Sequence, residues 1–429
     1  MIDLLPLPRE EFRCVCSDTK LTGEAFILPG MIPLLRSHCA KCSKRFLCQL
    51  RHGWHFGGRL MFDQAERSVI SADNIDWYEE EFRRAMASRG RPAPALEKIS
   101  RRPLGRDVTI VVALDPTYGH LLQRLFSIDA IDPATRATGM VVIVPRFAAW
   151  LVPDDAAEIW LVDAPLRELN LWNDAVADAV AALARNVDRL RLAPMRLGGY
   201  SVDVERYTRV KPFEANDIGQ VIPPRLTISW REDRCWTYRG QRKPDQEAVV
   251  EQFTMICTML DILRDKIADL DVAVIGYGKK GGFAPWVQDL RIVEHDTARE
   301  RDWAHRCSQS HLVFGIQGSN MILPSAHAGG SLELMPTGHW KHNMVTWEWT
   351  NRLSAQAAME RYLHIPLSSS FSDVISIALV QLCRMQVHAL WAAQSKAQDE
   401  TAARQLALAA LRVKGGQPIE YRDVAGQLL

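Results

Sequence analysis

The chain has 429 residues, of which 47% are hydrophobic and 24% charged, and its formal net charge is +1. This length allows two or three domains with separate cores. The balanced charge gives no reason to expect nucleic acid or a strongly anionic membrane as partner, and no apolar run approaches the ~20 residues of a membrane span.

The N-terminal sequence MIDLLPLPREEF lacks the basic start and the long apolar stretch of a signal peptide. We therefore expect a cytoplasmic protein, in which nine cysteines are typical of free thiols or a metal site rather than disulfides. Peripheral contact with a membrane surface and the oligomeric state are left open by the sequence.

Five of the nine cysteines lie in a Cys-rich N-terminal region, residues 1–60, as C-V-C at 14–16, C-A-K-C at 39–42 and Cys48. Thiolates two or three residues apart on turns can hold one tetrahedral Zn²⁺. Such a site would be structural, because four protein ligands leave no open coordination position. Reduced cysteines packed in a loop-rich region are the alternative, and five candidates for four positions leave the ligand set open. The closest pairs predict a site of Cys14, Cys16, Cys39 and Cys42.

An N-terminal α/β domain is expected over residues 61–224. Residues 62–105 connect it to the Cys-rich region and include a charged helix at 77–88. The run 108–114 is continuously apolar, which is typical of a strand buried on both faces. Alternation of strands and helices then predicts a parallel sheet in a doubly wound domain. The further elements are a helix at 121–128, strands at 139–144 and 158–162, a helix at 173–184, and a linker from Tyr207 to Pro223-Pro224.

The loop after the first of these strands carries Asp115 and Tyr118-Gly119-His120. A histidine titrates near neutrality and, at the mouth of a strand-to-helix loop, is suited to accept a proton from a hydroxyl. Asp115 would orient this imidazole or act as the base itself. In the alternative interpretation His120 caps the helix or only contacts ligand.

A second doubly wound domain is expected over 225–370, followed by C-terminal helices at 371–429. Arg231 and Arg234 come directly after its first strand, and guanidinium groups bind phosphate oxygens in a planar, bidentate way. A charged turn with ion pairs to Glu232 and Asp233 is the alternative. The elements are strands at 225–230, 272–275, 290–293, 312–316 and 331–335 and a long helix at 247–267.

A strand, a tight Gln317-Gly318-Ser319-Asn320 turn and a short helix follow one another near residue 318. Backbone N–H groups at the N-terminus of a helix attract a phosphate. Glu333, at the next strand end, would accept hydrogen bonds from a ribose diol. In the plainer interpretation Gly318 only supplies a turn and Glu333 is an ordinary strand-end charge.

Two further motif matches carry less weight. Gly276-x-Gly278-x-x-Gly281 fits a dinucleotide-binding loop, but only eight residues, 282–289, separate it from the next predicted strand, too few for a crossover helix. Asp269-Leu270-Asp271 fits the D-x-D of metal-dependent sugar transferases, but it joins a helix to a buried strand. We therefore predict no catalytic metal.

The run G-x-Q-G-S-N-M-x-L-P-S-A-x-A-G-G-S-x-E-L-M-P at 315–336 resembles the C-terminal signature of glycosyltransferase family 61, with Gln317 where that family usually has His. The stretch ISWREDRCW resembles the basic pair that the family places after a strand. Tyr118-Gly119-His120 resembles its N-terminal pattern, although Gln123 and Arg124 stand where a Glu is usual. The resemblance covers residues 110–336.

This resemblance implies an α/β protein of GT-B architecture, with two doubly wound Rossmann-like domains. The implied enzyme is an inverting glycosyltransferase, which moves a hexose or pentose from a nucleotide-diphosphate sugar to a hydroxyl acceptor such as a glycan in polysaccharide biosynthesis. His120 or Asp115 would be the base. The donor would be bound by Arg231, Arg234, Gln317, Gly318, Ser319, Asn320 and Glu333.

Three alternatives remain. A nucleotide-sugar epimerase of the same fold would act without an acceptor. An NAD-dependent oxidoreductase would use the Gly276–Gly281 loop. A zinc-stabilised binding module would bind sugar nucleotides without turnover. The nucleotide, the sugar and the acceptor are not identified by the sequence.

Overall fold

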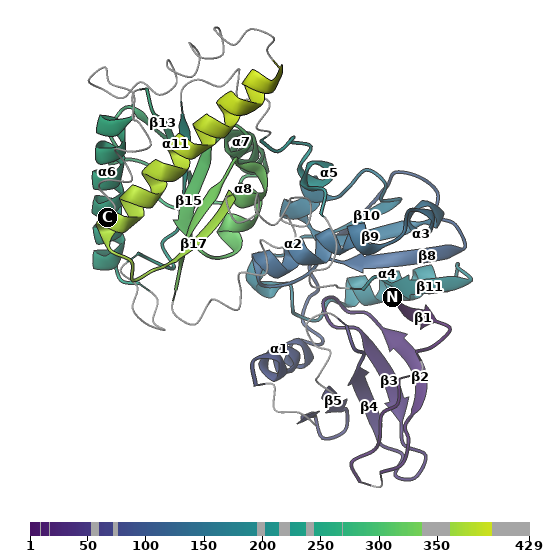
Figure 1. Ribbon diagram of the computed structural model, residues 1–429. Helices are drawn as coiled ribbons and strands as arrows, with labels where there is room; N and C mark the ends of the chain where they lie inside the picture. The colour runs from purple at the N-terminus through teal and green to yellow at the C-terminus, as the bar shows by residue number, and fades with distance from the viewer. Residues whose placement is uncertain are drawn as a thin grey trace. The chain divides into compact units, whose positions relative to one another are not determined.

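The computed structural model describes residues 1–8, 10–16, 18–52, 60–71, 76–194, 202–213, 224–236, 244–267, 269–336 and 361–396 (Figure 1). The chain divides into two compact units, Met1–Val202 and Asp203–Leu429. The predicted α/β class is confirmed, because each unit contains a sheet of parallel or mainly parallel strands covered by helices. The end of the predicted C-terminal helical region, 397–429, lies outside the described residues.

The N-terminal part of the first unit is an antiparallel five-stranded sheet, which the sequence did not predict. One face is apolar and packs against Phe82, Ala85 and Met86 of α1 (Asp76–Ala87). The sheet continues past residue 60, so the region expected only to connect two parts is itself ordered structure. Its strands, in order, are β2 (Thr22–Ile27), β3 (Leu34–His38), β4 (Arg45–Gln49), β5 (Leu60–Asp63) and β6 (Ser68–Ser71).

The second sheet of this unit has four parallel central strands with an antiparallel strand at each edge. Its order is β1 (Ile2–Leu5), β11 (Arg189–Leu192), β8 (Asp107–Val112), β9 (Met140–Pro145), β10 (Glu158–Val162) and β7 (Leu96–Ser100). Every residue of β9 is buried, as its continuous apolar sequence predicts. Its helices are α2 (Tyr118–Phe126), α3 (Pro133–Thr138) and α4 (Asp174–Ala184), with 3₁₀ turns η2 (Ser127–Ala130), η3 (Arg146–Leu151) and η4 (Leu166–Glu168).

The sheet of the second unit is parallel throughout. Its order is β14 (Val287–Asp289), β13 (Asp271–Gly276), β12 (Arg225–Trp230), β15 (Leu312–Ile316), β16 (Ser331–Met335) and β17 (Tyr362–Pro366). Numbered from its first strand this is 3-2-1-4-5-6, the order of a Rossmann fold. The predicted strand at 290–293 is wrong: the strand is β14, and only a single bridge, from Ile292 to Tyr277, lies in the predicted range.

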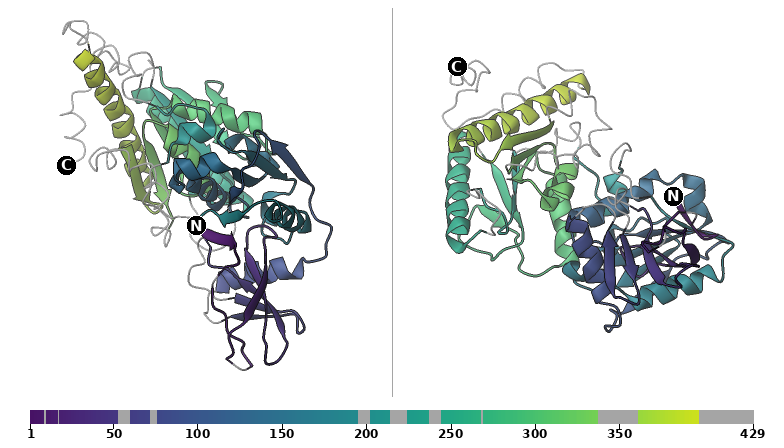
Figure 2. Two further views of the ribbon diagram at one scale, coloured as in Figure 1. Left: turned by 90° about the vertical axis from the view of Figure 1, so that its right-hand side faces the viewer. Right: turned by 90° about the horizontal axis from the view of Figure 1, so that it is seen from below.

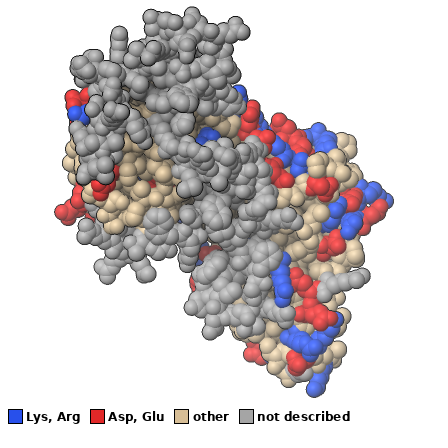
Figure 3. All heavy atoms as spheres, in the orientation of Figure 1, with Lys and Arg blue, Asp and Glu red and all other residues tan. Residues whose placement is uncertain are grey.

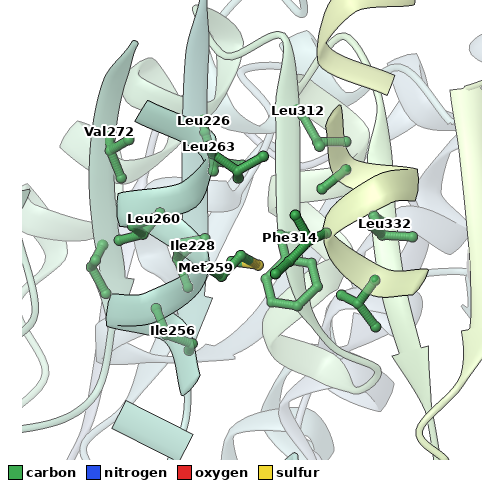
Figure 4. Close-up of a cluster of buried hydrophobic side chains, with 14 of the residues drawn as sticks. Leu226, Ile228, Ile256, Met259, Leu260, Leu263, Val272, Leu312, Phe314 and Leu332 are labelled. Carbon is green, nitrogen blue, oxygen red and sulfur yellow. The ribbon is translucent and has the colours of Figure 1, made fainter. Parts of the chain in front are cut away.

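Helices cover both faces of this sheet. The large core is formed with α6 (Gln246–Lys266) and α11 (Phe371–Lys396), and Figure 4 shows Met259 and Leu260 of α6 among the strand side chains that surround Phe314. On the opposite face lie α7 (Thr297–Ser308), η6 (Ser319–Met321) and α8 (Ile322–His327). Figure 2 shows α6 and α11 along this unit from two further sides.

Residues 203–213 belong to this second unit, which places its beginning before the predicted linker. After α5 (Val204–Thr208), the Thr208 hydroxyl lies 2.9 Å from Nε2 of His327, and the Phe213 N–H donates to the carbonyl of His327 at 2.7 Å. Phe213 also packs edge-on against the His311 ring. Residues 214–223 of the predicted linker lie outside the described part of the chain.

The described residues contain no helix that is long and apolar enough to span a membrane. On the face seen in Figure 3, acidic and basic side chains alternate over the described surface without a broad field of one sign.

The loop between β13 and β14 contains the Gly276–Gly281 motif and runs into β14 without a helix. A side chain at Gly276, where φ is +111°, would bring its Cβ to 2.2 Å from the Trp230 carbonyl oxygen. Arg291 pins the same loop by donating to the Gly281 carbonyl at 2.9 Å and pairing with Asp289. Gly276 is therefore needed for packing, and the loop lacks the helix N-terminus that holds a pyrophosphate.

Gly276→Ala and Gly281→Ala form a matched pair that tests this. Gly281 has φ of +110° but no atom within 4 Å of its Cβ position. Gly281→Ala should cost about 1–3 kcal/mol of unfolding free energy from backbone strain alone. Gly276→Ala should cost at least about 1–3 kcal/mol more, because backbone must move. Chemical denaturation measures both, and equal losses would contradict the steric account.

Candidate functional site

In the second unit, the strand order reverses between β12 and β15, since the chain builds the sheet outward from β12 in both directions. Loops that leave neighbouring strands at such a point diverge and leave a crevice at the carboxyl edge, where ligands bind in open α/β sheets. β12 is followed by Arg231 and β15 by Gln317. The residues predicted to bind a donor therefore begin at this crevice.

The structure brings the two predicted segments into contact. Nη1 of Arg231 donates to Oδ1 of Asn320 at 2.8 Å, and Nη1 of Arg234 donates to the Gln317 carbonyl at 3.0 Å. A Cβ atom at Gly318 would lie 2.1 Å from Nη1 of Arg231. A side chain at 318 would therefore displace the Arg231 guanidinium from the turn.

Arg231 also forms a bidentate pair with Asp233, from Nε to Oδ1 at 2.8 Å and from Nη2 to Oδ2 at 2.5 Å. Burial opposes ionisation of Asp233, but the hydrogen bonds and charge of Arg231 outweigh it and lower the pKa of this carboxyl. The charge of Arg231 is therefore already balanced. Its geometry suits a clamp that fixes the turn, and Arg234 lies beside the same turn.

Glu333 lies in the middle of β16 rather than at the strand end where the sequence placed it. It is 3% exposed and stands in register with Gly315 on β15 and His364 on β17. Its Oε2 is 3.9 Å from Nε2 of His364, and its Oε1 has no hydrogen-bond partner in the described structure. Burial raises the pKa of Glu333 to about 8. At neutral pH this group is mainly a neutral acid, able to donate as well as accept.

The first unit has a similar reversal at β8, which lies between β9 and β11. Asp115 follows β8, and its Oδ1 is 3.4 Å from Nδ1 of His120, in the first turn of α2. The same oxygen accepts the Thr117 N–H at 2.9 Å. His120 is about one-third exposed, whereas Asp115 is buried. Both predicted base candidates are thus brought together as a dyad.

Arg124, which was not predicted as a site residue, completes this arrangement. Its Nε donates to Oδ2 of Asp115 at 3.1 Å from a fully buried position. Burial raises the pKa of Asp115, but the hydrogen bond to His120 and the charges of Arg124 and His120 outweigh it, so the pKa is lowered. A carboxylate with a lowered pKa is a weak base, so the geometry favours His120 as base and Asp115 as its orienting partner. The sequence did contain a signal for this role, because Arg124 is a charged residue inside the mainly apolar run LLQRLF and a buried charge needs a partner.

The four predicted zinc ligands form one cluster whose sulfur atoms all lie within 4.8 Å of one another. Cys14 Sγ is 3.0 Å from that of Cys16 and 3.6 Å from that of Cys42. Four thiolates around Zn²⁺ at ~2.3 Å have sulfurs about 3.8 Å apart, so these residues could bind a metal ion.

Both cysteine pairs lie on tight turns. The Asp18 N–H donates to the Cys14 carbonyl and the Ser43 N–H to the Cys39 carbonyl, each at 2.8 Å. Cys48 does not take part: it is fully buried on β4. Among the described residues, the cysteines that could bind one metal ion together are therefore these four, without Cys48.

Asp271, of the D-x-D match, forms ion pairs with Arg306 at 2.8 Å and Arg225 at 3.0 Å. These contacts occupy its carboxylate at the start of β13.

No family model, curated protein or solved structure matches this chain.

Glu333→Gln should reveal the titration of this buried acid. A carboxyl whose pKa is higher in the folded than in the unfolded protein makes its full contribution to stability below the unfolded pKa, about 4.3. That contribution is lost as the pH rises through the folded pKa, about 8. The variant lacks this loss, so its free energy of unfolding should rise relative to that of the parent from pH 5 to pH 8, by at most about 1.4 kcal/mol per pH unit, and its melting temperature should rise with it. The exposed Glu247→Gln is the control. A difference that is constant with pH would show that Glu333 is ionised throughout.

Proposed function

We propose that this protein is an inverting glycosyltransferase of GT-B architecture that uses a nucleotide-diphosphate sugar. The observation that carries the proposal is the meeting of Arg231 and Arg234 with the 317–320 turn at the strand reversal of a Rossmann-ordered sheet. Nucleotides bind at this position in sheets of that order. The resemblance of residues 315–336 to glycosyltransferase family 61 supports the same reading.

In this proposal the donor diphosphate lies against the 317–320 turn. Arg234 and the first backbone N–H groups of the following helical turn would stabilise the charge that grows on the leaving diphosphate. Arg231 would hold the turn in place through Asn320. Glu333, as a buried neutral acid, would hydrogen-bond the ribose only if ligand binding opens a path to it.

The acceptor hydroxyl would be deprotonated by His120. Asp115 would hold the imidazole with Nδ1 toward the carboxylate and stabilise the positive charge it gains. Direct displacement at the anomeric carbon needs one base and no covalent enzyme intermediate, and such a base contributes about 10²–10⁴-fold to the rate.

Thermal-shift measurement against UDP, GDP, dTDP, CMP, their sugars, NAD and NADP tests the donor site. A ligand at 100 times its dissociation constant should stabilise the protein by about 2.7 kcal/mol. We expect one nucleotide diphosphate to stand out. Arg234→Ala should weaken it about 10-fold to 100-fold, as loss of a charge-assisted hydrogen bond does. Arg299→Ala, which removes an exposed arginine of α7, is the control. A response to NAD alone, or to none of them, would refute the proposal.

His120→Ala and Asp115→Asn separate chemistry from donor binding in the same assay. Both should keep the nucleotide shift, because these residues belong to the first unit. Transfer of sugar to acceptor should fall about 10²–10⁴-fold for His120→Ala. Conversion of the nucleotide sugar without any acceptor would instead identify an epimerase.

We also propose that Cys14, Cys16, Cys39 and Cys42 hold a structural Zn²⁺. The supporting observation is the cluster of four sulfurs on two separate turns. Four thiolate ligands fill a tetrahedral zinc shell, so the ion would link the two turns and take no part in the reaction.

Metal analysis of the purified protein should find about one zinc per chain, as a single four-cysteine site requires. Cys39→Ser should lose the metal and lower the melting temperature, since metal binding and folding are coupled. Cys48→Ala should retain it, because Cys48 lies outside the cluster. Retention of zinc by Cys39→Ser would show that the ligand set is wrong.

A further inference from the structure

Two adjoining cavities open at the carboxyl end of the sheet in the first unit. They have volumes of about 290 Å³ and 300 Å³, and Arg91, Glu168 and Leu171 line both. We call them together the 84–173 groove. Leu114, directly after β8, and Val162, the end of β10, form part of the wall, so the groove lies at the edge where α/β sheets bind ligands.

The deeper cavity is mainly apolar but contains an unused hydrogen-bond donor. Pro92, Leu169 and Trp172 are among the residues that line it. Asn173 also lines it and is 4% exposed; its Oδ1 accepts the Val176 N–H at the start of α4. Its Nδ2 has no hydrogen-bond partner among the described residues. A buried amide without a partner costs about 1–3 kcal/mol, which a ligand hydroxyl would recover.

The shallower cavity is basic. Arg84, Arg91 and Arg167 line it, and Glu168 is the one acid among the described residues of its lining. Glu81 pairs with Arg84 at 3.7 Å. The pairs formed there are loose: Arg167 lies 3.8 Å from Glu168, and its side chain is 85% exposed. The three guanidinium groups therefore leave a net positive charge, which suits a carboxylate or a phosphate.

The groove also begins beside the proposed base. Leu114 of its wall immediately precedes Asp115. A ligand in the groove would thus lie next to the Asp115–His120 dyad.

We propose that the 84–173 groove is the acceptor subsite and that it takes an acidic sugar, a pyranose that carries a carboxylate or a phosphate. The anionic group lies among Arg84, Arg91 and Arg167, a hydroxyl accepts from the Asn173 amide, and the ring lies against the apolar wall. The assignment as acceptor rests on the proposed glycosyltransferase function.

Ligand-observed NMR with the full-length protein tests this directly. The probes are D-glucuronate, D-glucose 6-phosphate and neutral D-glucose, with acetate and inorganic phosphate as anions without a sugar. We expect one acidic sugar to bind at least about 10-fold tighter than glucose and than its bare anion, since a charge-assisted hydrogen bond corresponds to about 10-fold to 100-fold. The preferred probe tells carboxylate from phosphate.

Arg91→Ala and Arg167→Ala should each weaken the preferred probe by about 10-fold or more. Both side chains are exposed, so the fold is retained. Arg83→Ala is the matched control, an arginine of the same helix that pairs with Glu79 and does not line the groove. Equal binding of glucose, equal binding of bare anions, or equal loss in Arg83→Ala would each overturn the proposal.

The failure of this inference and of the proposed function are distinguishable. If a nucleotide diphosphate stabilises the protein through Arg234 while no acidic sugar binds, the groove is not the acceptor subsite and the transferase stands. If an acidic sugar binds and Arg91→Ala and Arg167→Ala weaken it, while no nucleotide binds, the groove is an acidic-sugar site. Its assignment as the acceptor subsite of a transferase is then wrong.

Discussion

The contact of Arg231 with the Gly318 backbone is the constraint on which the candidate donor site depends. It joins the end of β12 to the turn after β15 at the point where the strand order reverses. Asn320 accepts from the guanidinium, and its own amide donates to Ser229 at 3.0 Å, so the turn is tied to β12 twice. A turn held in this way is pre-organised, which lowers the entropic cost of binding an anion there.

The two buried carboxyls of the candidate sites differ because their partners differ. Asp115 has a guanidinium at 3.1 Å and a backbone N–H at 2.9 Å, so its ionised form is stabilised despite burial. Among the described residues, the nearest ionisable partner of Glu333 is a histidine at 3.9 Å, and burial raises the pKa of this carboxyl. The same chemical group is thus suited to orient a base in one unit and to act as a neutral hydrogen-bonding acid in the other.

Much of the parallel-sheet architecture was predictable. Residues 312–316 are apolar at every position and residues 108–114 at every position but Thr109, and such runs indicate burial on both faces of a sheet. The five-stranded N-terminal sheet was missed because its strands lack that signal. The edge strand β7 also lacks an apolar run that would predict a strand, because four of its five residues are exposed. It is held in the sheet by pairing with β10 over all five residues.

The sequence by itself determined the α/β class, the positions of the loops that follow strands, and the two cysteine pairs, because these depend on residues close together in the chain. Tertiary structure alone decided the strand order, the exclusion of Cys48 from the sulfur cluster, and the pairing of Asp115 with Arg124. It also decided that Arg84, Arg91 and Arg167 line one groove. Each of these depends on how separate elements pack, and local spacing carries no information about that packing.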